Sequence, residues 1–386
     1  MIHGRRESSC GVDHSLPISF WAKMASACRI RRRCLTSARS LARTTVIMIL
    51  SIMLFSLVFY CLLRDKSADD AMLVKSLQEI GPWPLDDRTL FINDSIAKNV
   101  RRQARIFCWM TSRQTSLPKL LAVNSTWAQR CDAHVFVMTS AGRPLPPGSL
   151  DLGVPDGRNN LVAKTKRMMT WIYKNVVDKY DWFLKADDDT YVVMENLRFL
   201  LMHFDPKATV YIGHPFKYGP GYNSGGAGYV LSKSAIKRLV LEGFQGQKVC
   251  NSSLTDEDMF VGQCMRALNV SMYESRDRFR RDTFLPMSPQ KSFMGPRITD
   301  ITEYEWVRIP LGPACCSQLL ISMHYVTPEM MYLLEFALYR MAVYGRISPP
   351  ELFRRFFTND TLDTRRPYIN RHQQGPNQVQ NQAQNS

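Results

Sequence analysis

Between residues 101 and 345, short apolar runs alternate with longer amphipathic patterns. Candidate strands are 105–111 (RIFCWMT), 134–140 (HVFVMTS), 181–186 (DWFLKA) and 209–214 (TVYIGH). Candidate helices cover 161–178, 194–204, 233–242 and 255–269. For the third of these helices, Ser232 is placed as the N-cap and Gly243 follows the end. Strands separated by helices predict an α/β layer with a largely parallel sheet, in which ligands bind at the carboxyl ends of the strands.

The longest apolar run, 44–63, contains twenty residues without a charge, and as a helix it matches the roughly 30 Å hydrocarbon core of a bilayer. We predict a retained membrane-spanning anchor, because a cleaved signal peptide is shorter, lies nearer the N-terminus and ends in small residues. The preceding segment carries nine basic and two acidic side chains. The positive-inside bias therefore predicts a single-pass type II protein with its folded domain on the luminal side.

Five regions follow from these patterns. They are a cytosolic basic tail (1–43), the anchor (44–63), a luminal stem with a Gly-Pro-Trp-Pro breaker (64–100), a folded domain (101–345) and a C-terminal extension (346–386). The end of the extension is rich in Gln and Asn, and it lacks the apolar surface that folding requires.

The formal net charge of +16 is concentrated in part at the N-terminus. Nine basic minus two acidic residues place +7 of it in the tail, which leaves a moderately basic folded part. A basic domain suits anionic nucleotide-sugar substrates. Nucleic acid is not expected as a partner.

Six cysteines lie beyond the predicted anchor, and their even number in an oxidising lumen indicates three disulfides of open connectivity. They are Cys108, Cys131, Cys250, Cys264, Cys315 and Cys316. We expect the adjacent Cys315 and Cys316 to pair outward rather than with each other. No CxxC spacing supports a zinc site. Glycosylation sequons begin, all after the anchor, at Asn93, Asn124, Asn251, Asn269 and Asn359.

The strand at 181–186 runs directly into Asp187, Asp188 and Asp189. In extended backbone Asp187 and Asp189 project to one face and Asp188 to the other. Three adjacent carboxylates repel one another, so a divalent cation that also binds a diphosphate would hold two of them. The alternative is a solvated acidic turn that caps the helix at 194–204. The apolar strand just upstream favours the metal.

His324, in the run SMHYVTP, could complete this site, because mixed carboxylate and imidazole ligation suits manganese. Taken alone, a histidine beside Met323 and Tyr325 is more often a core residue, and that alternative stays open.

Two further segments carry candidate chemistry. The loop at 222–232 (YNSGGAGYVLS) has three glycines in four positions, which permits the close backbone approach of a sugar pocket or forms a plain turn. In the helix at 255–269, Asp258 could be a general base that deprotonates an acceptor hydroxyl. It could equally complete a capping box with Thr255.

An ordered set of motifs resembles the core 1 beta-1,3-galactosyltransferase family over about residues 101 to 345. The motifs are RIFCWMT, STWAQRC, DWFLKADDDTYVV, GGAGYVLS, the Glu257-Asp258 helix and CCSQLLISMHYV. The resemblance implies a GT-A fold with a Rossmann-like mixed sheet. It also implies an inverting, manganese-dependent transfer of galactose from UDP-galactose to the 3-hydroxyl of GalNAc on Ser or Thr of a glycoprotein. Together with the anchor, it implies a Golgi membrane protein, and a homodimer is left open.

The resemblance also implies roles for individual residues. The metal set is Asp187, Asp189 and His324. The nucleotide set is Met110, Thr111, Asp156, Gly157, Arg158, Lys164, Asp188 and Tyr325. The acceptor set is Tyr222, Gly225, Gly226, Glu257 and Trp306. Asp258 matches the base, which would remove the acceptor proton on one face while UDP departs from the other.

The chain departs from the family pattern at two places. Val162-Ala163-Lys164-Thr165 stands where the family commonly has Tyr-Trp-Lys-Thr, and the aromatic stretch before the paired cysteines is reduced. Aromatic faces commonly bind sugars, so the acceptor is the part of the prediction that these losses affect. Two alternatives are a Fringe-like beta-1,3-N-acetylglucosaminyltransferase and a non-catalytic chaperone of the transferase.

Overall fold

The computed structural model describes a large part of the chain. The described residues are 45–60, 71–72, 74–75, 95–217, 221–245, 250, 254–270, 272–273, 275–294 and 312–341. Two compact units are distinguished, Met1–Met72 and Leu73–Ser386. The basic tail at 1–43, Trp306 and the sequons at Asn93, Asn251 and Asn359 lie outside the described residues.

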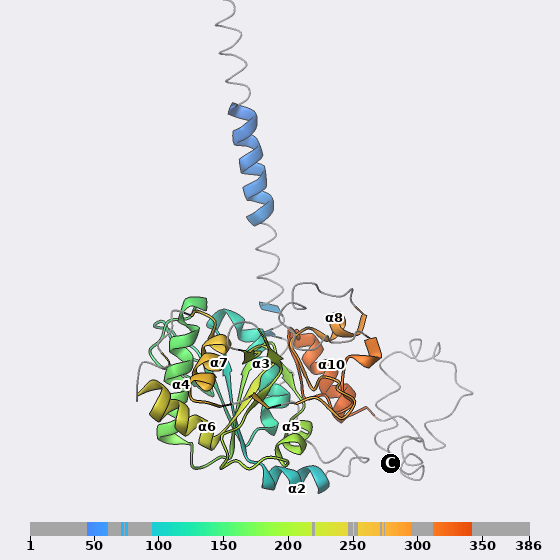
Figure 1. Cartoon of the computed structure of the whole chain (residues 1–386). Coiled ribbons are helices and arrows are strands. Elements are labelled where there is room, and N and C mark those ends of the chain that lie inside the picture. Colours follow the sequence, from blue (N-terminus) through green and yellow to red (C-terminus); the bar gives the residue numbers. More distant parts are fainter. Residues whose placement is uncertain are drawn as a thin grey trace, which may run out of the picture. The chain divides into compact units, whose positions relative to one another are not determined.

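The centre of the second unit is a twisted sheet (Figure 1). Within the described ranges it has seven strands in the order β10-β6-β9-β4-β1-β2-β3. The strands are β1 (Ile106–Thr111), β2 (Ala133–Val137), β3 (Ser149–Leu150), β4 (Trp182–Asp187), β6 (Tyr211–Gly213), β9 (Tyr229–Ser232) and β10 (Met272–Tyr273). Only β9 pairs antiparallel with its neighbours in this described sheet. The predicted α/β layer with a largely parallel sheet is confirmed, and it fits the GT-A architecture.

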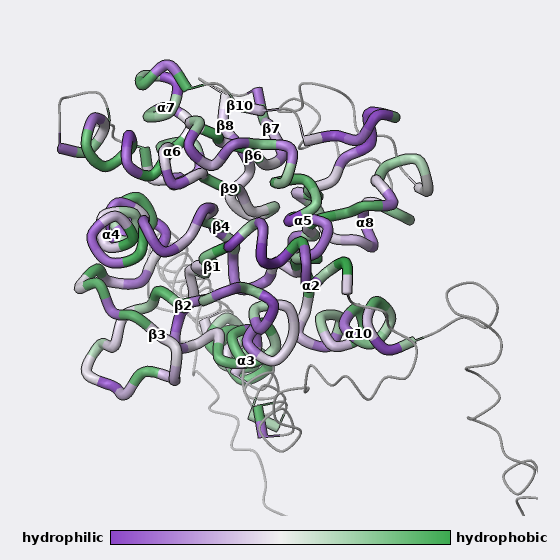
Figure 2. Tube along the Cα trace, turned by 90° about the horizontal axis from the view of Figure 1, so that it is seen from below, coloured by the Kyte–Doolittle hydropathy of each residue, from purple (hydrophilic) through white to green (hydrophobic). Residues whose placement is uncertain are grey.

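Helices cover both faces of the sheet. They are α2 (Ser95–Gln103), α3 (Leu117–Ser125), α4 (Leu161–Asn175), α5 (Met194–Leu201), α6 (Lys233–Arg238), α7 (Glu257–Ala267), α8 (Pro289–Met294) and α10 (Pro328–Tyr339). In Figure 2, α4, α6 and α7 lie on one side of the strands, and α3 and α10 lie on the other. Each side has its own apolar core.

Strand β1 shows why two cores form. Ile106, Cys108 and Met110 belong to the core under α3, α5 and α10. Phe107 and Trp109 belong to the core under α4, α6 and α7. Successive side chains of a strand point to opposite faces. A strand that is apolar at every position is therefore buried on both sides, as in other parallel sheets with helices on each face.

The helix predicted at 233–242 is longer and less regular than expected. Ser232 is the N-cap, since its hydroxyl accepts a hydrogen bond from the Ala235 amide, which confirms that part of the prediction. The chain then continues through a π-helical segment, Leu239–Phe244, so Gly243 lies inside it rather than after its end. A Cβ at Gly243 would lie 2.9 Å from the Cys250 sulfur. This glycine is therefore needed for close packing and not for helix termination.

The prediction of a single-pass type II membrane anchor is wrong. The predicted Golgi membrane location depended on that anchor and is therefore not supported either. None of the helices in the described ranges combines the length and apolar character that crossing a bilayer needs. The apolar run at 44–63 contributes a described helix over 45–60.

The cysteines of the described ranges form three disulfides, Cys108–Cys131, Cys250–Cys264 and Cys315–Cys316. Pairing of the six cysteines is confirmed, but the expectation that Cys315 and Cys316 pair outward is wrong. The other four sulfurs are already bridged in pairs within the two cores, so the adjacent pair closes on itself.

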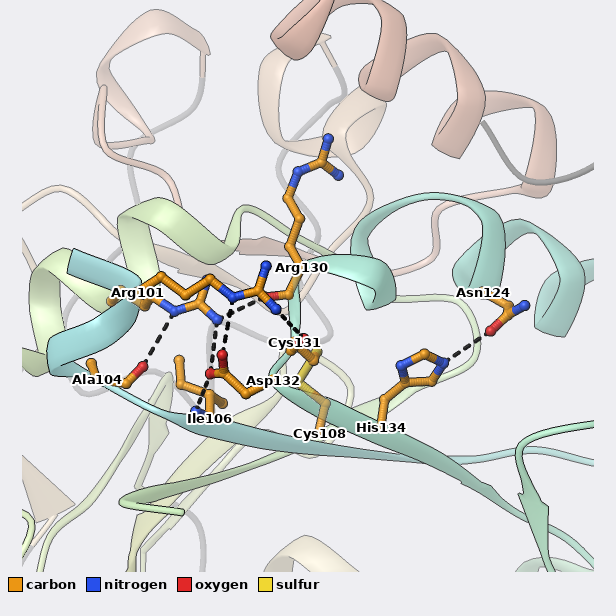
Figure 3. Close-up of a disulfide and its surroundings, with 10 residues drawn as sticks. Arg101, Ala104, Ile106, Cys108, Asn124, Arg130, Cys131, Asp132 and His134 are labelled. Atoms are coloured by element: carbon orange, nitrogen blue, oxygen red, sulfur yellow. Dashed lines mark hydrogen bonds and ion pairs between the residues drawn. A yellow bond between two sulfur atoms is a disulfide. The ribbon is translucent and has the colours of Figure 1, made fainter. Parts of the chain in front are cut away.

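The Cys108–Cys131 bridge ties β1 to the chain just before β2 (Figure 3). Beside it, Asp132 accepts hydrogen bonds from the Ile106 amide at 2.7 Å and from Arg101 Nε at 3.0 Å. These contacts hold the start of the two central parallel strands in register.

A second, small sheet brings distant segments to the end of β4. Its strands are β11 (Phe284–Leu285), β12 (Ser322–Met323) and β5 (Tyr191–Val192), in that order. Because β12 pairs antiparallel with β5, the residue after β12 lies beside the residues just before β5. A hairpin of β7 (Pro215–Phe216) and β8 (Tyr222–Asn223) leads into the glycine loop.

Helix α10 is fixed to the sheet by a buried ionic cluster. Arg130 donates to both carboxylate oxygens of Glu335, at 3.0 and 2.6 Å, and Tyr191 donates to the same carboxylate at 3.1 Å. The Arg130 guanidinium also lies 3.6 Å from the centre of the Tyr339 ring. The side chain of Glu335 is 2% exposed.

We predict that Glu335→Ala lowers the free energy of unfolding by about 3–5 kcal/mol, because the buried Arg130 loses its bidentate partner and keeps the longer contact to Glu195 at 3.7 Å. Urea denaturation followed by tryptophan fluorescence measures the change. The double variant Arg130→Met/Glu335→Leu should cost less than the single one, since no unpaired charge remains. A single variant as stable as the wild type would contradict this account of α10.

Candidate active site

A cleft of about 460 Å³ lies at the carboxyl ends of β1 and β4. Thr111 and Asp187 end the two strands and stand opposite each other in the register. The cleft is lined by Thr111, Ser112, Arg113, Lys119, Gly157, Arg158, Leu161, Lys164, Asp187, Asp188, Asp189 and His324. The cleft lies at the edge of the sheet where the sequence predicts a ligand site.

Asp187, Asp189 and His324 come together in this cleft. One ligand atom from each lies within 4.8 Å of the others. Asp188 turns aside and accepts a hydrogen bond from the Ser112 hydroxyl at 2.7 Å. The alternative of an acidic helix cap does not hold, because α5 begins after Val193 without a side-chain cap. Two carboxylates and an imidazole form a donor set that fits a divalent ion such as manganese.

Tertiary pairing places His324, which is 135 positions after Asp189 along the printed sequence. The His324 Nε2 atom lies 3.2 Å from Asp189 Oδ1. The Val326 amide donates to the Asp189 carbonyl at 2.9 Å, and the His324 amide donates to the Leu285 carbonyl at 3.1 Å. The ring is therefore held from both neighbouring strands, and His324 is not simply a core residue.

The glycine loop makes room for this histidine. A Cβ at Gly226 would lie 2.0 Å from Cε1 of His324. No side chain fits there while the ring stays in place. One of the three clustered glycines is thus explained by close approach to the candidate metal site.

Asp188 and Asp189 have pKa values that are shifted in opposite directions. Burial raises the pKa of Asp188 to about 6, against the lowering effect of the Ser112 hydroxyl and the Lys119 charge. Burial would also raise the pKa of Asp189, but hydrogen bonds and charge from His324 and Lys119 outweigh it and hold the pKa well below its ordinary value. Lys119 Nζ lies 2.9 Å from Asp189 Oδ2. Asp189 is therefore the acid of this pair that stays ionised over a wide pH range.

Four of the side chains that line the cleft are cationic. They are Arg113, Lys119, Arg158 and Lys164. Lys164 is almost fully buried and pairs with Asp156, whereas Arg158 is largely exposed and lies 2.6 Å from Asp256. A cleft lined by both carboxylates and cations suits a metal-bound diphosphate.

The predicted nucleotide set is only partly gathered here. Thr111, Gly157, Arg158, Lys164 and Asp188 line the cleft, and Asp156 joins it through Lys164. Met110 is fully buried in the core. Tyr325 is 55% exposed and stacks on His324 with 3.7 Å between the ring centres.

Asp258 is held by the glycine loop and not by a capping box. The N-cap of α7 is Asp256, and it makes no side-chain cap bond. One Asp258 oxygen accepts from the Gly225 amide at 2.8 Å and the other from the Met259 amide at 2.9 Å. Burial raises the pKa of Asp258, although the Gly225 amide opposes this. Asp258 is not among the residues that line the cleft, but a carboxylate of raised pKa that is held by the glycine loop is a candidate base.

The rest of the predicted acceptor set is less exposed than expected. Glu257 is buried, pairs with Lys185 at 2.7 Å and accepts from the Tyr229 hydroxyl at 3.0 Å. Tyr222 is 9% exposed. In this structure Glu257 therefore contacts the protein interior, and Trp306 cannot be placed.

Sequence reasoning missed Lys185, Ser112 and Lys119. Lys185 is a charge within an apolar strand, two positions before Asp187 and hence on the same face. This charge in an otherwise apolar strand is the feature of the sequence that could have identified Lys185. Burial lowers the pKa of Lys185, but the charges of Asp187 and Glu257 outweigh burial and raise it overall, so the ammonium stays charged.

Comparisons with known proteins agree with this geometry. A family model described as Fringe-like matches residues 106–290. The chain is 34% identical over 297 residues to glycoprotein-N-acetylgalactosamine 3-beta-galactosyltransferase 1 of Xenopus laevis, which covers 74% of this chain and 79% of that protein. It is 27% identical over 181 residues to a beta-1,3-glucosyltransferase of Mus musculus, covering 46% and 36%. It is 26% identical over 196 residues to chondroitin sulfate synthase 3 of Homo sapiens, covering 45% and 22%.

The first of these relatives aligns over most of both chains, and the alignment with the other two is confined to less than half of this one. Together with the carboxylates and cations that line the cleft at the end of β4, this shows that the chain belongs to the core 1 beta-1,3-galactosyltransferase family of Fringe-like glycosyltransferases, and that it is a beta-1,3 glycosyl transferase.

Proposed function

We propose that the chain transfers galactose from UDP-galactose, with inversion, to the 3-hydroxyl of GalNAc on Ser or Thr of a glycoprotein. The observation that carries the proposal is the meeting of Asp187, Asp189 and His324 in a cleft that cationic side chains also line. The named activity of the Xenopus laevis relative supports the choice of donor and acceptor.

Asp187, Asp189 and His324 would hold manganese. When bound, such an ion neutralises the diphosphate charge and so makes UDP a better leaving group. Two cationic residues of the cleft bind the phosphates directly. Lys164 is a buried ammonium, and Arg158 is an exposed guanidinium that has to exchange Asp256 for the ligand.

Asp258 would act as the general base. Its carboxylate, held in place by the Gly225 amide, removes the proton from the acceptor hydroxyl as that oxygen attacks the anomeric carbon. Attack from the face opposite the departing UDP inverts the stereochemistry.

The departures from the family pattern lie away from the phosphates. Val162 packs against the core and Ala163 is exposed, while Lys164 and Thr165 of the same helix are buried toward the site. This supports retained donor chemistry with a changed acceptor surface. A chaperone without activity has no need for the complete acidic and histidine set, so the enzyme is the better supported hypothesis.

A donor panel tests the sugar. Full-length protein with manganese and a GalNAc-peptide should release UDP from UDP-galactose faster than from UDP-GlcNAc or UDP-glucose. The last of these donors is included because a beta-1,3-glucosyltransferase is among the relatives. If UDP-GlcNAc or UDP-glucose were turned over faster, that sugar would replace galactose in the proposal. If no donor were turned over, the proposed enzymatic function would be wrong.

We predict that Asp189→Asn weakens binding of Mn²⁺ at least about tenfold, because it removes one charged oxygen donor from the site. Isothermal titration of the metal alone measures the dissociation constant. Asp178→Asn is the matched control, since that aspartate is largely exposed and pairs only with Lys237 among the contacts of the described residues. Equal Mn²⁺ affinity in both variants would argue against Asp189 as a ligand.

We predict that Asp258→Asn lowers kcat about 10²–10⁴-fold while the affinity for UDP and Mn²⁺ stays close to wild type. A base must be ionised, and burial raises the pKa of Asp258 above the ordinary 3.8. Wild-type activity should therefore rise with pH through a point above 3.8. A pH profile of kcat/KM checks this, and an Asp258→Asn variant with normal kcat would exclude the residue as base.

We predict that Gly226→Ala reduces Mn²⁺ affinity as much as His324→Ala does, because the new Cβ occupies the space of the imidazole ring. Gly142→Ala is the control: Gly142 has a left-handed φ of 79° and open space around it. It should cost stability only, by about 1–2 kcal/mol. Normal metal binding by Gly226→Ala would mean that His324 is not a ligand.

A further inference from the structure

Lys185 is a buried cation that the mechanism above leaves unused. It lies in β4 with a side chain that is 3% exposed. Its ammonium contacts Asp187 Oδ1 at 2.7 Å, Glu257 Oε1 at 2.7 Å and the Gly225 carbonyl at 3.1 Å. A lysine has three N–H donors, so these partners account for all of them.

The three partners belong to three different parts of the site. Asp187 is a candidate metal ligand at the end of β4, Glu257 begins α7 and Gly225 starts the glycine loop. The same Gly225 donates its amide to Asp258 at 2.8 Å. A chain of three hydrogen bonds, between Asp187 and Lys185, between Lys185 and Gly225 and between Gly225 and Asp258, thus connects the candidate metal ligand with the candidate base.

Lys185 also distinguishes the two oxygens of Asp187. The Thr111 hydroxyl donates to Oδ1 at 2.9 Å, and Lys185 donates to the same atom. Neither of these two donors contacts Oδ2. The carboxylate is therefore held at one oxygen, and Oδ2 is the one left for a cation.

A purely structural ion pair would need only Glu257. Lys185 and Glu257 alone would neutralise each other and dock α7 on the sheet, and the Tyr229 hydroxyl already satisfies the second oxygen of Glu257. The additional bonds to Asp187 and to the Gly225 carbonyl are beyond what docking requires.

We propose that Lys185 is a positioning residue that orients Asp187 toward the metal through Oδ2 and sets the separation between the metal site and Asp258. This inference rests on the proposed function of the site, because it assumes that Asp187 is a metal ligand and Asp258 the base. It predicts that metal binding and proton removal both depend on a side chain that touches neither substrate.

The test uses the full-length chain with Lys185→Met, the double variant Lys185→Met/Glu257→Gln, and Arg198→Met/Asp132→Asn as a control. Arg198 is also a buried cation, but its bonds go to Asp132 at 3.0 Å and to the Ala104 and Arg130 carbonyls, on the other face of the sheet. Melting temperature, the dissociation constant for Mn²⁺ alone, and kcat and KM are measured for each variant.

Lys185→Met alone should melt at a lower temperature, because it leaves Glu257 buried without a counter-charge. The double variant should recover most of this loss. Its Mn²⁺ affinity should nevertheless stay at least about tenfold below wild type, as when a residue that orients a metal ligand is removed, and its kcat should fall more than its KM rises. The control pair should change melting temperature only.

A double variant that binds Mn²⁺ like the wild type would show that Lys185 is only structural, and the inference would be overturned while the proposed function stood. A wild-type chain that neither binds Mn²⁺ nor turns over UDP-galactose would overturn the proposed function itself, and the inference with it.

Discussion

The structure depends on balancing the negative charge that collects where β4 ends. Asp187, Asp188 and Asp189 follow one another, and Glu257 and Asp258 approach from α7. Carboxylates so close together are stable only beside cations or hydrogen-bond donors. Lys185 supplies a buried charge on one side, and Lys119 a half-exposed one on the other. A divalent ion on Asp187 and Asp189 would complete the same balance.

The strands and helices around the end of β4 position the side chains of the cleft. The parallel pairing of β1 and β4 places Thr111 against Asp187, and the small sheet of β5 and β12 delivers His324. Helix α10, held by the Arg130–Glu335 pair, also holds Tyr191 at the start of β5. Packing distant from the cleft therefore supports the position of its ligands, which is how rigid elements preorganise a site.

Binding of the donor and binding of the acceptor require different kinds of side chain. Phosphates and a cation need charged groups at fixed places, and these are complete among the described lining residues. An acceptor sugar and peptide need an adaptable, partly aromatic surface. Of the two changed positions in α4, Ala163 is exposed and Val162 packs against the core, whereas Lys164 lines the cleft. A family member can therefore keep its donor chemistry while its acceptor surface changes.

Local pattern in the sequence determined strands β1, β2, β4 and β6 of the described sheet, the N-cap at Ser232 and the acidic triplet at a strand end, because these signals depend on neighbouring residues alone. The two-residue strands β3 and β10 are too short to leave such a pattern. The ordered motifs also determined the family. Local pattern failed where packing decides, as with Gly243 inside a π-helical segment and Asp258 held by Gly225 instead of Thr255. It also failed for the anchor predicted at 44–63, because none of the helices in the described part of the chain is long and apolar enough to cross a bilayer. Only the tertiary structure decided that His324 meets Asp189, that Cys315 bonds to Cys316 and that Lys185 joins three segments of the site. These contacts join residues through the pairing and packing of whole elements, and no spacing along the chain encodes them.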